Sequence, residues 1–287
     1  MNRISVLVSL GLGVILLSGC GSDPITQVRD TTSPVLYKRI VSLSPSSTEI
    51  ATRLGYVEIV GCTASCDLPP QANVPVIMNG LKPDYEKIMA LKADAVLYDH
   101  DIISESDLAK FKEMDLPTFD TGGVENTVAS FNQKLLELGV VTHGESALSD
   151  YVDRINKEIS TAKGNAISPA PKVAILLAGE GAEHMIAGTN SFTADLVRNA
   201  QAEPVGPAAK NFVTLNAEWF KSSDPDVIFV PGDPSSVQND PRFKTLKAVL
   251  NKRVAQFSPE LLMRRGGRVE SAIKNLNVAI YNLMAKK

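Results

Sequence analysis

The sequence has no excess of positive charge, few histidines and none of the common catalytic motifs. Its formal net charge is −3, so no basic face is expected and nucleic acid is not an expected partner. The three scattered histidines argue against a zinc or manganese site built from several of them. There is no Gly-x-Ser-x-Gly elbow, no His-Glu-x-x-His and no phosphate loop. These absences favour a binding protein over an enzyme.

Cysteine is also scarce, with three residues in the chain. Cys62 and Cys66 are four positions apart in an expected loop, which is compatible with a disulfide, a soft-metal site or two unpaired thiols. Spacing alone does not fix the Cβ geometry that a disulfide needs, so the three alternatives stay open.

The N-terminus carries an apolar run that is too short to span a membrane as a helix. Residues 1–20 contain one early arginine, an apolar core and then Leu17-Ser18-Gly19-Cys20, which is typical of a lipoprotein signal peptide. Cys20 is then the lipidation site, and the alternative is ordinary signal cleavage that discards it. Residues 21–36 are polar and predict a flexible tether. We expect an extracytoplasmic protein attached to a bacterial membrane by lipid.

The stretch from Arg39 to Leu97 predicts a strand, a tight loop, a helix and a second strand. Ser46 and Glu49 form the pattern of a capping box at the start of that helix, and Gly55 stands where a glycine would end it. In such a βαβ unit the loop after the first strand faces the ligand. Ser44 and Ser46 are therefore candidate ligand-binding residues.

Farther along, strands alternate with amphipathic helices, which argues for parallel sheets covered on both faces. The segment from Glu145 to Ala162 has no glycine or proline and places Leu148, Tyr151 and Ile155 on one face. As a helix it would be about 27 Å long, enough to connect two lobes and to limit their relative motion. The expected fold is α/β: two doubly wound α/β lobes joined by a single long helix, with a ligand cleft between the lobes. The boundaries are 37–139 for the N-terminal lobe, 140–165 for the connecting helix and 166–287 for the C-terminal lobe.

Three segments carry a resemblance to a known family: RIVSLSPSSTEI, CDLPPQA and DYEKIMALKADAVL. In this order they resemble the substrate-binding lipoproteins of ABC importers for cobalamin, ferric siderophores and haem, and the second segment is closest to the cobalamin-binding branch. The resemblance implies a small-molecule ligand, no resident cofactor, and a permease and ATPase complex as the partner.

The resemblance also places candidate ligand residues in the loops that face the cleft. Ser65 stands where cobalamin-binding relatives have an aromatic residue, Leu68 replaces a second one, and Trp219 is the only tryptophan. A corrinoid would therefore have few rings to stack on. Haem could use His100 or His184 as an axial ligand, and a siderophore could be held by Arg264 or Arg265. The full set of candidates is Ser44, Ser46, Ser65, Cys66, Asp67, Asn79, His100, His184, Arg264 and Arg265.

Two glutamates occupy matching places in the two lobes. Glu86 precedes Asp94 by the same offset of eight with which Glu218 precedes Asp226, and in each unit a helix leads to a buried strand. One interpretation is that each glutamate only stabilises its own helix N-terminus. The other, which the resemblance favours, is that both dock on arginines of the transporter. Alternatives for the whole chain are a metal-ion or other small-ligand lipoprotein, a purely structural lipoprotein, or an extracytoplasmic enzyme on a similar two-lobe fold.

Overall fold

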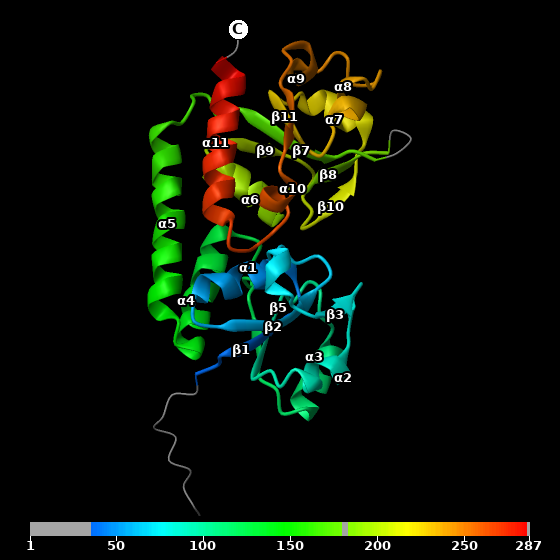
Figure 1. The fold of residues 1–287 in the computed structure, drawn as a ribbon. Helices are drawn as coiled ribbons and strands as arrows, with labels where there is room; N and C mark the ends of the chain where they lie inside the picture. Colours follow the sequence, from blue (N-terminus) through cyan, green and yellow to red (C-terminus); the bar gives the residue numbers. More distant parts are fainter. Residues whose placement is uncertain (1–35, 180–182, 286–287) are drawn as a thin grey trace, which may run out of the picture. The chain divides into compact units, whose positions relative to one another are not determined.

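The computed structural model describes residues 36–179 and 183–285, and residues 35–287 form one compact unit (Figure 1). The N-terminal lobe contains β1 (Arg39–Ser42), α1 (Pro45–Leu54), β2 (Glu58–Thr63), β3 (Val76–Asn79), β4 (Lys82–Pro83), α2 (Tyr85–Ala90), β5 (Ala95–Tyr98), α3 (Glu105–Glu113) and β6 (Thr118–Asp120). Two long helices follow, α4 (Val128–Thr142) and α5 (Glu145–Gly164). No helix among the described residues is long and apolar enough to cross a membrane.

The C-terminal lobe follows the same alternating plan. It contains β7 (Lys172–Leu177), β8 (Met185–Ala187), α6 (Phe192–Asn199), β9 (Glu203–Val205), β10 (Phe212–Thr214), α7 (Ala217–Ser223), β11 (Val227–Pro231), α8 (Ser235–Gln238), α9 (Lys247–Leu250), β12 (Val254–Phe257), α10 (Pro259–Leu262) and α11 (Val269–Ala285). The expected two-lobe α/β fold is confirmed.

Each lobe is built on one sheet whose centre is parallel and whose edge is antiparallel. The first sheet has the order β4-β3-β2-β1-β5-β6, with β3 and β4 antiparallel. The second has the order β10-β8-β7-β11-β12, and β9 also pairs with β7. In this sheet β8 runs antiparallel to both of its neighbours. The parallel centre was expected. The antiparallel edges were not, since their strands are only two to four residues long.

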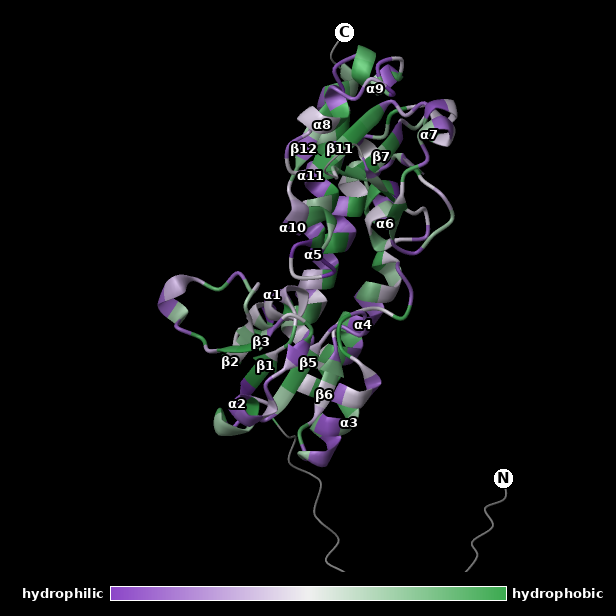
Figure 2. Cartoon of the chain, turned by 90° about the vertical axis from the view of Figure 1, so that its right-hand side faces the viewer, coloured by the Kyte–Doolittle hydropathy of each residue, from purple (hydrophilic) through white to green (hydrophobic). Residues whose placement is uncertain are grey.

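Successive side chains of the central strands point to opposite faces of each sheet, so the apolar residues contribute to separate cores. Ile40 of β1 and Val227 of β11 face a large core, whereas the next residues, Val41 and Ile228, face smaller cores of their own lobes. The large core is continuous across both lobes and takes in the apolar faces of α4, α5 and α11. Figure 2 shows the hydrophobic residues concentrated in the strands of the two sheets. The predicted connecting helix is therefore part of a core that both lobes share.

The start of α1 corrects one sequence prediction. The N-cap is Ser44, whose Oγ accepts a hydrogen bond from the Ser47 amide at 2.9 Å, and Pro45 occupies the first helical turn. Proline is well suited to this position because its missing N–H would have no helical partner. The predicted Ser46–Glu49 capping box is wrong, which leaves Glu49 free to bind elsewhere. Gly55 ends the helix with φ +74°, as expected.

Candidate functional site

A cavity of about 270 Å³ is lined by residues of both lobes. The N-terminal lobe supplies side chains from the first turn of α1 and from the loops that follow β5 and β6. The C-terminal lobe supplies side chains from the start of α6, the start of β10 with the two residues before it, and the end of α10 with the segment after it. The lining residues are Ser46, Asp99, Asp101, Ile102, Asn126, Ser191, Phe192, Thr193, Lys210, Asn211, Phe212, Leu262, Met263 and Arg265. In open α/β sheets ligands bind at the carboxyl ends of the strands, which is where the N-terminal residues of this list lie.

Arg265 forms the polar centre of this cavity. Its side chain is 6% exposed, and its Nη2 donates to Asp99 Oδ1 at 3.0 Å and to Asp101 Oδ2 at 2.6 Å. Its Nη1 donates to Asn126 Oδ1 at 3.0 Å. All three acceptors belong to the N-terminal half of the chain, whereas Arg265 follows α10. The predicted ligand-binding arginine therefore bridges the two lobes.

His100 lies next to this group. Its Nδ1 is 3.0 Å from Asp120 Oδ2, and its Nε2 is 3.6 Å from Asp101 Oδ1. A Cβ on Gly122 would come within 2.9 Å of the imidazole, so glycine is needed for this ring position. Asp99, His100 and Asp101 are close enough together to hold a metal ion. However, the Arg265 guanidinium already binds both aspartates of this trio, which disfavours a cation there.

A second ionic group lies outside the cavity and also joins the lobes. Arg264 Nη1 binds Asp67 and, at 3.1 Å, Glu49 Oε1, and Arg268 Nε lies 3.1 Å from the same Glu49 oxygen. Burial raises the pKa of Glu49, whereas the hydrogen bond from Arg264 lowers the pKa of Asp67. The two carboxylates share their arginines but differ in how much water reaches them.

The other candidates from the first loops are brought only partly together. Ser44 is fully buried as a helix cap, while Ser46 lines the cavity. Ser65 and Asn79 are exposed and do not line the cavity. They also do not line a separate surface pocket to which Glu49, Asp67 and Arg268 contribute. Cys66 forms a disulfide with Cys62, with their Cα atoms 6.3 Å apart, which decides between the three alternatives for this pair.

His184 does not line the cavity. It is 2% exposed, its Nε2 lies 3.2 Å from Asp240 Oδ2, and its ring centroid is 5.6 Å from that of Phe243. The hydrogen bond from Arg242 lowers the pKa of Asp240 to about 2, so this carboxylate is ionised beside the histidine. These contacts are those of a buried structural histidine.

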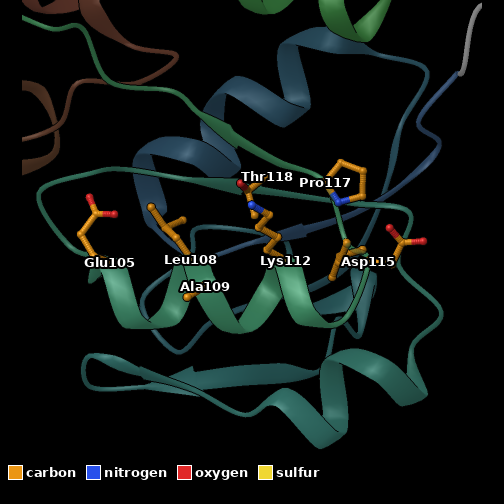
Figure 3. Close-up of a pocket in the computed structure, with 8 residues that line it drawn as sticks. Glu105, Leu108, Ala109, Lys112, Asp115, Pro117 and Thr118 are labelled. Atoms are coloured by element: carbon orange, nitrogen blue, oxygen red, sulfur yellow. The ribbon is translucent and has the colours of Figure 1, made fainter.

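A wider hollow, of about 500 Å³, lies on the N-terminal lobe alone. It runs along α3 and the chain that leads into β6, and Figure 3 shows Glu105, Lys112 and Asp115 among its lining side chains. Its lining residues all belong to the N-terminal lobe. A ligand there would not contact both lobes, so the smaller cavity is the better candidate site.

Glu86 and Glu218 occupy equivalent helix positions. Each is the second residue after an N-cap, Asp84 in α2 and Asn216 in α7, and both are exposed. Neither carboxylate has a hydrogen bond or ion pair within the part of the chain that the structure describes. The aspartates that follow are equivalent too.

Asp94 and Asp226 show how closely the two lobes repeat one another. Asp94 accepts hydrogen bonds from the amides of Lys38 and Arg39 at the start of β1. Asp226 accepts one from the Lys172 amide at the start of β7. Each aspartate thus fastens the first strand of its lobe, which makes the two helix–strand units structurally as well as sequentially alike.

Sequence reasoning missed most of the cavity lining, including Asp99, Asp101, Asn126 and Lys210. A signal was available for two of them, because Asp99 and Asp101 directly follow the buried strand β5 and parallel strands present their carboxyl ends to ligands. Asn126 and Lys210 lie in long loops without a comparable pattern. Cys20 lies outside the described residues, as does the middle of the loop that precedes His184.

Comparison with known proteins places this architecture in a family. A family model described as "Periplasmic binding protein" matches residues 40–261. The chain is 22% identical over 310 residues to an uncharacterized ABC transporter substrate-binding lipoprotein, YvrC, of Bacillus subtilis. The alignment covers 98% of each of the two chains.

Solved structures share the fold at low identity. The periplasmic haem-binding protein HutB of Vibrio cholerae is similar with a TM-score of 0.76 and 18% identity, covering 85% of this chain and 99% of that one. The vitamin B12-binding protein BtuF of the same organism is similar with a TM-score of 0.71 and 19% identity, covering 87% of this chain and 98% of that one. The chain therefore belongs to the periplasmic binding protein family, as a solute-binding protein of the ABC-transporter type.

Proposed function

We propose that the protein captures a corrinoid, a ferric siderophore or haem outside the cytoplasm and delivers it to an ABC permease and ATPase complex. The observation that carries this proposal is the cavity lined from both lobes. Its lining combines apolar side chains, among them Phe192, Phe212 and Leu262, with a few convergent polar groups, which is the usual composition of a small-molecule site. Such a lining suits a ligand with an apolar body and charged or polar substituents.

The ligand is identified by titration of the purified mature protein. Calorimetry with cobinamide, cobalamin, haemin and ferric siderophores should give saturable, one-to-one binding for one of these classes. Trp219 does not line the cavity, so its emission is a poorer reporter than heat or ligand absorbance. Absence of binding in all three classes would contradict the proposal.

If the ligand is haemin, His100 is the candidate axial ligand. His100 does not itself line the cavity but adjoins the lining residues Asp99 and Asp101. Its Nδ1 is held by Asp120, which leaves Nε2, 3.6 Å from Asp101 Oδ1, as the nitrogen that would bind iron. His100→Ala should then change the haem absorption spectrum, whereas His143→Ala, at an exposed position on another part of the lobe, should not. An unchanged spectrum in His100→Ala would leave the siderophore and corrinoid classes.

Delivery would use Glu86 and Glu218 as docking residues for arginines of the permease. Their equivalent, exposed and unpaired positions in the described chain support this role. Rim charges mainly set encounter rate and orientation, so Ala or Arg at either site should impair uptake and leave ligand affinity unchanged. Arg should be more harmful than Ala because it adds repulsion. The matched control is Glu145→Arg, in the exposed first turn of α5.

Membrane attachment would depend on Cys20. Cys20→Ser should release the protein from the membrane fraction or leave the signal peptide uncleaved, which immunoblotting of cell fractions detects. Normal processing with unaltered membrane association would rule out the lipoprotein proposal.

A further inference from the structure

Arg265 is held by two aspartates that differ sharply in solvent exposure. The Asp99 side chain is 8% exposed and that of Asp101 is 64% exposed, although both bind the same Nη2. An ion pair with a water-exposed carboxylate adds little free energy, because water solvates that carboxylate well when the pair separates. Asp101 can therefore leave the guanidinium far more easily than Asp99 can.

The place of Asp101 on the guanidinium suits another anion. Arg265 is 6% exposed, and its Cζ lies 6.0 Å from the centre of the Phe192 ring. Asp99 stays paired with this buried charge when Asp101 leaves, and Nη2 is then free to donate to another anionic group. A planar guanidinium is also well matched to carboxylate or phosphate oxygens.

The charges that line the cavity are balanced with Asp101 in place. Asp99 and Asp101 contribute two negative charges, and Lys210 and Arg265 contribute two positive ones. Lys210 is exposed and has no hydrogen bond or ion pair within the described residues. An anionic group that replaced Asp101 would keep this balance and would lie between two cations.

We propose that Asp101 is an internal substitute for an anionic group of the ligand, and that ligand binding displaces it from Arg265. This inference rests on the proposed function, and it assigns the ligand a carboxylate or phosphate group beside an apolar body. Asp99 and Asn126 keep Arg265 in position, while Asp101 prevents the empty cavity from holding small anions of the medium.

The test uses citrate as a probe with the full mature protein, so it does not depend on the identity of the natural ligand. Asp101→Asn should bind citrate about two- to fivefold more tightly than the wild type, the range expected for removal of an exposed charge partner. Combining it with Arg265→Gln should abolish this gain, and Arg265→Met provides a second uncharged variant if the glutamine protein does not fold. Isothermal titration and citrate-induced thermal stabilisation measure both effects.

Asp115→Asn is the matched control, because it makes the same change in net charge at an exposed position of the same lobe. Three results would overturn the inference: no gain in Asp101→Asn, an equal gain in Asp115→Asn, or a gain that persists without Arg265. Each of these leaves the ligand titrations of the wild type unaffected, so the two proposals can fail separately.

Discussion

The two sides of the contact between the lobes depend on different interactions, apolar packing on one side and ion pairs on the other. On one side α4, α5 and α11 bury a single apolar core that continues into both lobes. On the other side the lobes meet through arginines 264, 265 and 268 and four carboxylates. Apolar packing is dense and has no alternative partner, whereas ion pairs exchange partners at small cost. The first side fixes how the lobes are joined, and the second can respond to a ligand.

One residue connects the two sides. Tyr151 of α5 is fully buried, its hydroxyl donates to Gly266 O at 2.8 Å, and it accepts from the Val269 amide at 2.9 Å. Arg53 lies over its ring at 4.5 Å. The loop that carries the three arginines is thereby attached to the helix that carries the shared core.

The largest expected effect comes from opening the apolar side. Ile155 is fully buried in the shared core, so Ile155→Ala should lower the free energy of unfolding by about 2–5 kcal/mol through lost burial and a cavity. Urea unfolding measures this, with Lys157→Ala on the exposed face of α5 as the control. Two separate transitions would show that the lobes do not depend on a common core.

Removing the Tyr151 hydroxyl should have an intermediate effect. Tyr151→Phe keeps the ring in the core but leaves Gly266 O and the Val269 amide without their partner, at a cost of about 1–3 kcal/mol. The comparison is Tyr281→Phe, whose ring is half exposed. Equal stabilities for the two variants would mean that water replaces the lost hydroxyl.

The same division between apolar packing and ion pairs explains what the sequence could predict. The strand Ala95–Tyr98, the end of α1 at Gly55 and the apolar face of α5 depend on nearby residues, and all three agree with the structure. The short edge strands were missed because two to four residues carry no measurable periodicity. Local pattern was therefore enough for the two-lobe fold and its long helix, whereas the predicted boundary at 139/140 falls inside α4, which ends at Thr142.

The ion pairs on the other side of the contact between the lobes, which we call the ionic side, could not be predicted from local sequence pattern. Arg264 and Glu49 are 215 positions apart, and Arg265 and Asp99 are 166 apart, so their pairing appears only when both lobes have folded. The sequence indicated which arginines would lie near the cleft but not that carboxylates of the other lobe would occupy them. The surroundings of His184 could not be predicted for a similar reason, because only the folded chain brings Phe243 and Asp240 around it.

The smallest expected effect is on the exposed part of the ionic side. Asp67→Asn removes the carboxylate that binds Arg264 and Arg268, yet that side chain is 39% exposed, so the loss at pH 7 should be under about 1 kcal/mol and should shrink further in high salt. The pH dependence has a definite sign. Because the hydrogen bond from Arg264 lowers the pKa of Asp67 below 3.8, its contribution is complete above that pH and is lost as the pH falls through the lowered value.

Urea unfolding of Asp67→Asn and the wild type between pH 2 and 7 tests this, at low and at high salt. The two curves should approach each other as the pH falls, because the wild-type carboxylate then becomes protonated, and Asp115→Asn should follow the wild type throughout. A loss at pH 7 as large as that of Ile155→Ala would contradict the comparison, because it would make the ionic contacts as important for joining the lobes as the apolar core. A loss under about 1 kcal/mol at pH 7 would instead mean that these ion pairs are weak enough for a ligand to rearrange them.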